Sequence, residues 1–352
     1  LAGMSSSPSY VLCEKIGEGA TSVVHLATKR GHSGDDGGSF PPRYAAKIFR
    51  DMDKNKKWFL KEVAALKAVS HRNVMSLVDI VDLDQLEEDS KKKKKQPNGA
   101  TSCGERPQSE SSSSSGPPVA SSEASSAIAK ILDKPKDGAT VLILRLAPNK
   151  DLLHYLLEGG AFNDVETRTL FKQVLEGVQA CHDAGVVHRD LKPDNLLLDE
   201  DYQIMISDFG FSCKTKEKGQ RLYRNLGSNG YTAPEVFERK GYDHMVDVWS
   251  LGVTLFTLRT GRPPYTKEDD TDYWFRLLVR KRNDTFWRAV EKLAHRQFPE
   301  DFKDLVNKML CPDPVSRVSI GDALQHPYMR LGPDMLSKAR LKEAMRNHVT
   351  LR

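Results

Sequence analysis

The sequence predicts an α+β fold in two parts, an antiparallel sheet with one helix followed by a mainly helical part. Residues 10–83 hold short strand-like stretches around one helical segment, and residues 84–138 then change to a polar, low-complexity composition. From residue 139 onward, one apolar strand leads into segments with helical periodicity. With 352 residues, the chain is long enough for two lobes and a sizeable core.

The first part is expected to contain four strands and one helix. Residues 10–29, "YVLCEKIGEGATSVVHLATK", indicate two strands joined by a glycine-rich turn, and residues 43–50 and 75–83 indicate two more. The helix is predicted over residues 55–70, where apolar residues recur at helical spacing: Phe59, Val63, Leu66 and Val69.

Residues 84–138 are expected to form a disordered insertion in the first part. They hold the run Lys91–Lys95, many serines and few large apolar residues, so they cannot bury enough apolar surface to offset the entropy of ordering. The lysines leave two alternatives, a solvated linker or an anchor for nucleic acid or an anionic membrane. Because this run alone equals the formal charge of +5, the rest of the chain is balanced and no nucleic-acid partner is expected.

The second part begins with an apolar strand over residues 139–148 and continues as helices. Asn163 and Glu166 have the spacing of a capping box, and an apolar face follows them. Residues 246–258 and 302–310 also indicate helices.

Composition narrows the class of protein. We find no run of about 18 apolar residues, so no membrane-spanning helix is expected. The opening "LAGMSSSPSY" lacks a charged region followed by an apolar one, so no signal peptide is expected. The five cysteines show no C-x-x-C spacing, which argues against a zinc site and a disulfide framework. We therefore expect a reducing, cytoplasmic setting, with the nucleus left open.

The turn "GEGATS" (17–22) is a candidate phosphate-binding loop. Gly17 and Gly19 would let the hairpin approach a ligand closely and turn backbone N–H groups toward phosphate oxygens. A plain turn is the alternative. A strand follows these glycines where a dinucleotide-binding fold would need a helix, which argues against that fold.

Lys47 lies inside the apolar stretch "AAKIF". A buried charge needs a partner, because leaving it unpaired is costly. Glu62, on the helix that follows, is spaced to share a face with Phe59 and Leu66, so we expect it to pair with Lys47. The alternative is a solvent-exposed lysine on an edge strand.

The stretch "HRDLKPDN" (188–195) sets an aspartate, a lysine and an asparagine between apolar residues that pin the loop to a core. It resembles the catalytic loop of eukaryotic protein kinases, whose H-R-D-x-x-x-x-N pattern it matches at every fixed position. The resemblance implies that Asp190 takes or orients the proton of the attacking hydroxyl, and that Asn195 holds a magnesium ion. Lys192 would neutralise charge on the phosphoryl group, and the Lys-Pro pair is similar to the Ser/Thr branch of the family.

Three later motifs extend the resemblance, which covers roughly residues 10–330 apart from the insertion. In "SDFG" (207–210) Asp208 is implied as the main magnesium ligand. The "APE" motif ends at Glu235, implied to pair with Arg317, and Asp247 of "DVWSLG" is implied to hold the backbone of the catalytic loop.

The family resemblance implies a bilobal protein-kinase fold, with an N-lobe over 10–146, a C-lobe over 147–330 and a basic helical tail over 331–352. ATP and Mg²⁺ are the implied cofactors. The residues implied to surround or hold ATP are Gly17, Gly19, Val24, Ala45, Lys47, Glu62, Arg145, Ala147 and Leu197.

The chain departs from the family pattern at three places. Ser22 replaces the third glycine of the loop, and the 84–138 insertion stands where most relatives have a short turn. Many kinases also carry a phosphorylated Ser or Thr about nine residues before the alanine of the APE motif, but Arg224 occupies that position. Arg189 is therefore expected to lack its usual phosphate partner.

The resemblance implies an ATP-dependent protein kinase that acts on Ser or Thr of proteins. Asp151 and Asp194 match positions that contact an upstream arginine of the substrate in basophilic relatives, so we expect a basophilic enzyme. The alternative is a regulatory subunit or pseudokinase that scaffolds partners. The presence of Lys47, Glu62, Asp190, Asn195 and Asp208 argues for the enzyme, because a scaffold has no chemical need of all five.

The tail over residues 332–352 is expected to form a basic amphipathic helix that starts near Pro333 and Asp334. Its loose apolar flank is predicted to comprise Leu336, Leu341, Ala344, Met345 and Val349. Such a helix is typical of calmodulin targets, and "ARLKEAM" is similar to the regulatory segment of the calcium/calmodulin-dependent kinase group. Two alternatives stay open, a calmodulin-binding segment or a helix that packs on the C-lobe.

Overall fold

The computed structural model describes residues 10–30, 42–82, 86–88, 140–215, 220–238, 240–330 and 335–350. Packing divides the chain into two units. The first holds the residues up to Asn55 together with Leu77–Leu146, and the second holds Lys56–Ser76 together with Ala147–Arg352. The helix predicted over residues 55–70 thus belongs mostly to the second unit, and the predicted domain bounds stay predictions.

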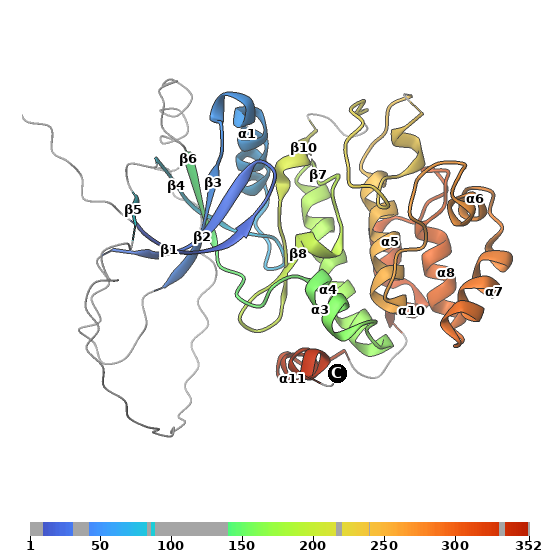
Figure 1. Cartoon of the computed structure of the whole chain (residues 1–352). Coiled ribbons are helices and arrows are strands. Elements are labelled where there is room, and N and C mark those ends of the chain that lie inside the picture. The colour runs from blue at the N-terminus through green and yellow to red at the C-terminus, as the bar shows by residue number, and fades with distance from the viewer. Residues whose placement is uncertain are drawn as a thin grey trace, which may run out of the picture. The chain divides into compact units, whose positions relative to one another are not determined.

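The first unit is built on a six-stranded sheet (Figure 1). Its strands stand in the order β4-β6-β3-β2-β1-β5. Neighbouring strands pair antiparallel except for β1 and β5, which pair parallel. The strands are β1 (Tyr10–Glu18), β2 (Ser22–Lys29), β3 (Arg43–Phe49), β4 (Leu77–Asp82), β5 (Leu86–Glu88) and β6 (Thr140–Arg145).

The second unit is mainly helical, which together with the sheet confirms the predicted fold class. Asn163 and Glu166 form the predicted capping box at the start of α4. No described helix is both long and apolar enough to cross a membrane. The helices are α1 (Met52–Ala68), α3 (Leu152–Gly159), α4 (Asp164–Asp183), α5 (Met245–Thr260), α6 (Tyr273–Val279), α7 (Asn283–Ala294), α8 (Glu300–Met309), α9 (Ile320–Gln325), α10 (Pro327–Arg330) and α11 (Lys338–Thr350).

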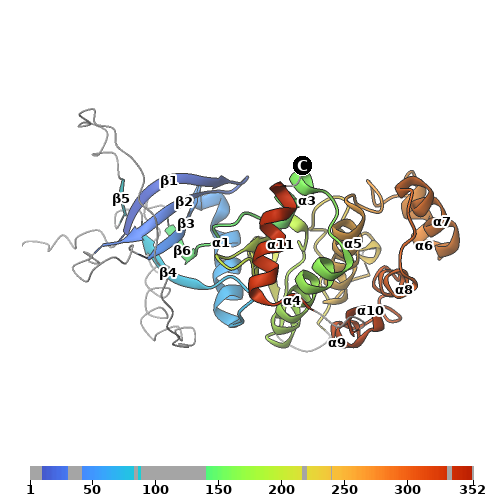
Figure 2. The same cartoon turned by 90° about the horizontal axis from the view of Figure 1, so that it is seen from below.

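The C-terminal helix α11 lies along α3 and α4 of the second unit (Figure 2). Leu341 and Met345 are buried, and the ring of His348 stacks on Phe162 with 4.2 Å between centroids. Of the two alternatives for the tail, the described helix takes the one in which it packs on the helical unit. It begins at Lys338, and the start predicted near Pro333 and Asp334 lies outside the described residues.

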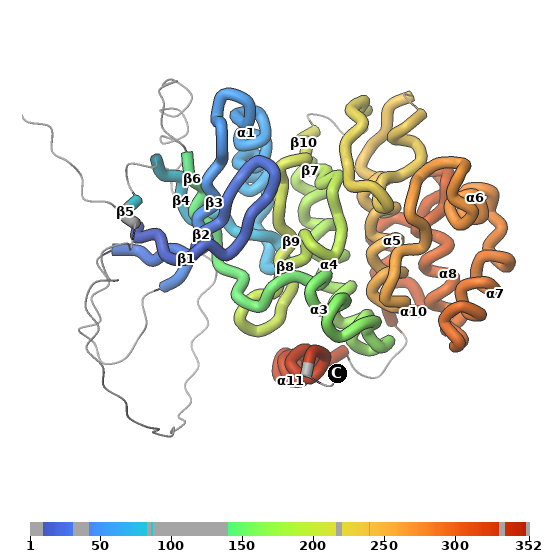
Figure 3. The backbone as a smooth tube through the Cα atoms, viewed as in Figure 1, coloured from blue at the N-terminus to red at the C-terminus, as the bar shows by residue number. Residues whose placement is uncertain are grey.

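Two small two-stranded sheets adjoin the polar loops of the second unit (Figure 3). Strand β8 (Leu196–Leu198) pairs antiparallel with β9 (Ile204–Ile206), and β7 (Val186–Val187) pairs with β10 (Cys213–Lys214). Short 3₁₀ turns adjoin these pairs: η3 (Pro193–Asn195), η4 (Phe209–Phe211) and, farther along, η5 (Pro234–Val236).

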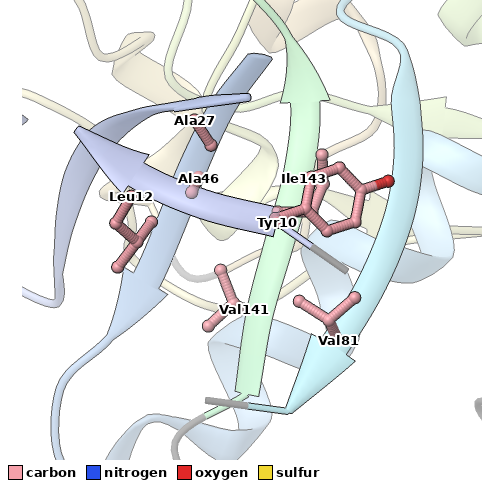
Figure 4. Packing of buried hydrophobic residues seen from close by; sticks show 7 residues of the cluster. All are labelled: Tyr10, Leu12, Ala27, Ala46, Val81, Val141 and Ile143. Carbon is pink, nitrogen blue, oxygen red and sulfur yellow. The ribbon is translucent and has the colours of Figure 1, made fainter. Parts of the chain in front are cut away.

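The core of the first unit is a cluster on the sheet (Figure 4), which comprises Tyr10, Leu12, Ala27, Ala46, Val81, Val141 and Ile143. Leu86 packs against this cluster, although the sequence assigned it to the disordered insertion over residues 84–138. That prediction is wrong for residues 86–88, because an apolar side chain next to β1 gains burial and a strand partner. The rest of the predicted insertion lies outside the described residues.

Candidate active site

The backbone of the loop that contains Asp190 is clamped by a buried carboxylate. Asp247, at the start of α5, accepts hydrogen bonds from the backbone N–H of His188 at 2.9 Å and of Arg189 at 2.7 Å, as predicted. His182 lies 2.8 Å from the same carboxylate. Burial alone would raise the pKa of Asp247, but the partners His182, His188 and Arg189 hold it below its usual value. The charged carboxylate therefore holds Arg189 at a positive φ of 67°, which is uncommon for a residue with a Cβ.

The carboxylate of Asp190 is held from three sides. Asn195 donates from Nδ2 to the backbone oxygen of Asp190 at 2.7 Å and to its Oδ2 at 3.1 Å. The hydroxyl of Ser228 donates to Oδ1 at 2.7 Å, and Lys192 Nζ lies 3.4 Å from Oδ2. With only 6% of the residue exposed, this acid is fixed in position and already accepts a hydrogen bond from a hydroxyl group.

Lys192 links the acid to its surroundings. Its Nζ donates to Ser228 Oγ at 2.7 Å and lies 3.2 Å from Asp194. Burial would lower the pKa of Lys192, but Asp190 and Asp194 raise it above its usual value, so the amine stays charged. Burial raises the pKa of Asp194 above its usual value, although the charge of Lys192 acts to lower it.

Asn195 and Asp208 flank the same end of the β8–β9 strand pair. Asn195 directly precedes β8, and Ser207, after β9, donates from its backbone N–H to the carbonyl of Asn195 at 2.9 Å. This bond brings Asp208, the next residue, to the same end of the pair, where its backbone is left-handed with φ 59°. The side-chain N–H groups of Asn195 donate to Asp190, so the side-chain oxygen of Asn195 is available to bind a metal ion.

These two side chains fit a magnesium ion better than a zinc ion. Among the described residues, no group of three or more His, Cys, Asp or Glu is arranged to hold a metal. Asn195 and Asp208 offer two oxygen ligands, and Mg²⁺ is commonly held by one or two protein oxygens together with waters and substrate phosphates.

The loop after residue 226 is anchored by two acids. Glu235 forms the predicted pair with Arg317, with two N–O distances of 2.6 and 2.9 Å in the buried interior. Glu268 accepts from the backbone N–H of Gly230 and, at 3.1 Å, from that of Thr232. Glu268 was missed by the sequence reasoning, because it stands 36 residues beyond Thr232 in a segment without a motif.

The first unit brings together several residues predicted to bind ATP. The register of its strands pairs Gly17 with Val24, Val24 with Lys47, and Lys47 with Leu142. These residues therefore form one row across four strands, while Ala45 pairs with Leu144 and Arg145 ends β6 beside Tyr44. Gly19 lies in the turn, where its N–H donates to the carbonyl of Ser22 at 2.9 Å.

The other residues predicted to bind ATP belong to the second unit. Glu62 is 2% exposed and shares the buried face of α1 with Phe59 and Leu66. Leu197 lies in β8 and forms an isolated β-bridge with Asp151. Ala147 is the first residue of the segment Ala147–Arg352, which makes up most of the second unit. Since Lys47 and Glu62 lie in different units, their pairing stays a prediction.

Arg189 has partners that the sequence reasoning missed. Its Nε and Nη2 donate to the carbonyl of Phe211 at 2.9 and 2.5 Å, and Nη2 also donates to that of Ser212 at 3.2 Å. Its Nη1 donates to the hydroxyl of Tyr242 at 3.2 Å, and that hydroxyl donates to the carbonyl of Arg224. The sequence did not predict the role of Tyr242, which is to link Arg189 to the backbone of Arg224. A backbone carbonyl can belong to any residue type, so no motif identifies such a contact.

Comparison with known proteins agrees with this geometry. The model of the protein kinase domain family matches residues 119–329, which is more than half of the 352 residues. The chain is 38% identical over 193 residues to calcium/calmodulin-dependent protein kinase type 1 of Caenorhabditis elegans, with 53% of each chain covered. It is also 38% identical over 202 residues to the liver/testis phosphorylase b kinase gamma catalytic chain of Bos taurus, which covers 53% of this chain and 46% of the relative. The chain thus spans about half the length of the curated relatives it matches.

Proposed function

Because the chain belongs to the protein kinase family, we propose that it transfers the γ-phosphoryl group of Mg-ATP to serine or threonine residues of proteins. The observation that carries this proposal is the carboxylate of Asp190, which accepts a hydroxyl hydrogen bond while Asn195 and Lys192 hold it. A fixed acid that accepts from a hydroxyl has the geometry that proton removal from an alcohol requires.

In this proposal each residue has a separate task. Asp190 accepts the hydrogen bond of the substrate hydroxyl, orients it and holds its proton at a carboxylate oxygen. Lys192, kept charged by Asp190 and Asp194, places a positive charge beside the phosphoryl group. Asn195 and Asp208 would hold Mg²⁺, which, when bound, neutralises negative charge on the phosphates.

For the nucleotide we assign the row Gly17, Val24 and Lys47 of the first unit. A Cβ on Gly17 would come no closer than 3.6 Å to Val24, and one on Gly19 would meet only the carbonyl of Ser22 at 3.9 Å. Packing inside the unit therefore does not require glycine at either position. Their small size instead allows a ligand to approach the backbone closely. The remaining ATP-binding residues in this proposal are Ala45, Glu62, Arg145, Ala147 and Leu197.

We also propose a preference for substrates with an upstream arginine. Asp151 caps α3 by accepting from the backbone N–H of His154 at 2.8 Å, and its charge is only partly shielded from solvent. Asp194 shares its charge with Lys192, so Asp151 is the stronger candidate of the two. A peptide array in which each position upstream of the acceptor is varied tests this preference, and equal rates with arginine and alanine at every position would contradict it.

The test of the kinase function compares the chain with its Asp190→Asn variant on a peptide array with Mg-ATP. Turnover should fall about 10²–10⁴-fold, while ATP affinity stays nearly unchanged. Asp201→Asn is the matched control, because this acid contacts Lys338 and Lys342 of α11 instead. No phosphoryl transfer by the unaltered chain would favour the scaffold alternative, and equal turnover of both chains would contradict the role of Asp190.

A calmodulin-like partner at residues 332–352 is a further proposal, supported by the basic character of α11 and by the name of one relative. Leu341 and Met345 are buried against the helical unit, so the helix would have to leave this position before calmodulin could bind its apolar face. Calcium-loaded calmodulin titrated against the full chain and a chain ending at Leu331 tests this proposal. Saturable binding by the full chain alone supports it, and equal behaviour of both chains contradicts it.

We propose a cytoplasmic location on the grounds of the cysteines. The four described cysteines, Cys13, Cys181, Cys213 and Cys311, carry free thiols, which suits a reducing compartment. Fractionation of cells that express the tagged chain tests this location.

A further inference from the structure

A groove lies on the helical unit where α9 and α10 pack against α4 (Figure 2). Its volume is about 430 Å³, near the lower end of the range for ligand-binding pockets. Arg168, Lys172 and Glu176 line it from α4, four residues apart and therefore on one face of that helix. We call this feature the α4–α10 groove. None of the described residues that line it belongs to the candidate active site.

The rest of the groove combines apolar residues with a third cation. Met329 and Arg330 line it from α10, and Met335 lines it from the segment that leads to α11. That segment is held on α4, because the backbone N–H of Leu336 donates to the hydroxyl of Thr169 at 3.0 Å. Methionine side chains are flexible and polarizable, so they can adapt to apolar groups of different shapes.

Two of the three cations have no acid of their own. The guanidinium of Arg168 lies 5.6 Å from the centroid of the buried Tyr328 ring, which positions it without neutralising its charge. Asp164, four residues earlier on the same helix, already pairs with Arg259 through two contacts of 2.7 Å. Within the described ranges, no carboxylate forms an ion pair with Arg168 or Arg330.

The single acid of the groove does not balance these charges. Glu176 accepts from Arg72 at 2.7 Å, so a cation that does not line the groove already pairs with it. Lys172 Nζ lies 4.0 Å from the same carboxylate, which is beyond hydrogen-bond distance. Lys172 and Arg330 are exposed, so their N–H groups are accessible to a ligand. The groove is therefore positively charged, and an acidic ligand complements it.

The spacing of the cations defines the shape of that ligand. Arg168 and Lys172 stand four residues apart on a helix, which corresponds to about 6 Å along its axis. Acidic residues two positions apart in an extended peptide are separated by roughly 6–7 Å and face the same side. Such a peptide can place one carboxylate on each cation. An apolar side chain on the same face of the peptide can then pack on the methionines.

Two other anionic partners fit the groove less well. Single-stranded nucleic acid is usually held by stacking on aromatic side chains, and none of the described lining residues is aromatic. A protein that binds a membrane surface projects its apolar residues into the lipid. Here the apolar residues line a recess, which a lipid surface cannot enter as readily as a single side chain can.

We propose that the α4–α10 groove is a docking site for a short acidic segment of a protein partner. Two acidic residues of this segment contact Arg168 and Lys172, and a large apolar residue packs on Met329 and Met335. The inference goes beyond the proposed function and does not depend on phosphoryl transfer.

The probe for this site is a fluorescent peptide without serine, threonine or tyrosine, in which two glutamates and a leucine stand at alternate positions. Fluorescence anisotropy measures its binding to the full-length chain. It should bind about tenfold more tightly than the same peptide with glutamines, as expected for one or two charge-assisted hydrogen bonds. Arg168→Gln and Lys172→Gln should each remove most of this difference. Met335→Ser should weaken both peptides, because it removes an apolar contact.

Arg288→Gln is the matched control, because Arg288 is an exposed arginine on α7 that does not line the groove. Thermal unfolding checks that each variant folds. If Arg168→Gln does not fold, the exposed Lys172 decides the test alone.

Each of the following outcomes overturns the inference. Equal affinity for the glutamate and glutamine peptides, or unchanged binding by Lys172→Gln, removes the site. A scrambled peptide of the same composition that binds as tightly shows only general electrostatic attraction. Binding that is lost in Asp190→Asn places the peptide at the catalytic loop. Phosphatidylserine vesicles that bind the chain through Lys172 and displace the peptide show that a membrane surface is the occupant.

Discussion

The helical unit contains two groups of charge that are arranged in opposite ways. Around Asp190 each charge has a partner. Asn195, Lys192 and Ser228 contact the carboxylate of Asp190, and Lys192 also forms an ion pair with Asp194. In the second group, Lys61 is repelled by Arg189 and Arg224, whose charges have the same sign as its own. The two groups are adjacent in the chain, since Arg189 directly precedes Asp190.

The difference indicates what each group does. Paired charges are already oriented before a substrate binds, which suits a group that must act on a reacting atom without reorganising. Unpaired like charges repel one another, so a lysine among them gives up its proton more readily. Arg189 belongs to both groups, because Asp247 holds its backbone N–H and its charge repels Lys61.

The largest effect is expected from breaking the clamp beneath the paired group. In Asp247→Asn one backbone N–H, of His188 or Arg189, would face an amide N–H₂ in place of a carboxylate oxygen. The loop should shift, and kcat should fall roughly hundredfold, because a displacement near 1 Å has an effect of that size. Steady-state kinetics with saturating ATP measure it.

Asp243→Asn is the control for the clamp, because Asp243 accepts from a backbone N–H at the same end of α5 without touching the loop. Binding of the acidic peptide to the α4–α10 groove gives the second readout. If the groove and the catalytic loop act separately, acidic-peptide binding by Asp247→Asn should change far less than kcat. An equal loss of acidic-peptide binding and of kcat would show that Asp247→Asn unfolds the unit.

A smaller effect is expected from pH on the unpaired group. Burial, together with the like charges of Arg189, Arg224 and Lys57, lowers the pKa of Lys61 to about 8, while Cys213 acts in the opposite direction. In an unfolded chain a lysine has a pKa of about 10.4. Between these two values the unfolded chain binds more protons than the folded one, so the free energy of unfolding should rise as pH increases from about 8 to about 10. Solvent reaches part of this side chain, so the rise should be smaller than for a fully buried amine. Urea unfolding at each pH measures it.

Lys61→Arg sharpens this pH experiment, because a guanidinium keeps its charge over the whole range. The free energy of unfolding of this variant should rise less over the same pH range. A rise of equal size in both chains would show that a different group titrates.

The paired group was largely predictable from the sequence, and the unpaired group was not. Asp190, Lys192 and Asn195 lie within six residues of one loop, so a local pattern identifies them together. The pairs Glu235–Arg317 and Asp247 with its loop were also predicted from motifs and are confirmed.

The unpaired group depends on residues that no local pattern connects. Lys61 lies on a helix predicted only from its apolar face, and Tyr242 acts through a hydroxyl and backbone carbonyls. The position of α11 was left open for a similar reason, because two buried residues one helical turn apart, Leu341 and Met345, suit either a partner or the chain's own surface. The strand over residues 86–88 was missed because three residues are too short for a periodic signal.

A still smaller effect is expected from removing the bridge between Arg189 and Arg224. Tyr242→Phe deletes the hydroxyl that accepts from Arg189 and donates to the carbonyl of Arg224. The free energy of unfolding should fall by about 1 kcal/mol, the usual net value of a hydrogen bond, and turnover by a few-fold. Thermal unfolding and kinetics measure both. Tyr223→Phe is the control, since the side chain of Tyr223 is exposed, and an equal loss in the two variants would contradict the role of the Tyr242 hydroxyl.

The smallest effect is expected from removing phosphate from the enzyme itself. Carbonyls of Phe211 and Ser212 and the hydroxyl of Tyr242 already occupy Arg189, and the same hydroxyl holds Arg224, so the segment is tied at both ends without a phosphate. Phosphatase-treated chain, or a Thr215→Ala/Tyr223→Phe double variant, should keep most of its activity toward an unphosphorylated peptide. Activity that collapses after this treatment would show that one of the two hydroxyls carries a required phosphate. The unpaired group would then have a phosphate of the chain's own loop as its partner, and the contrast between a paired and an unpaired group would no longer hold.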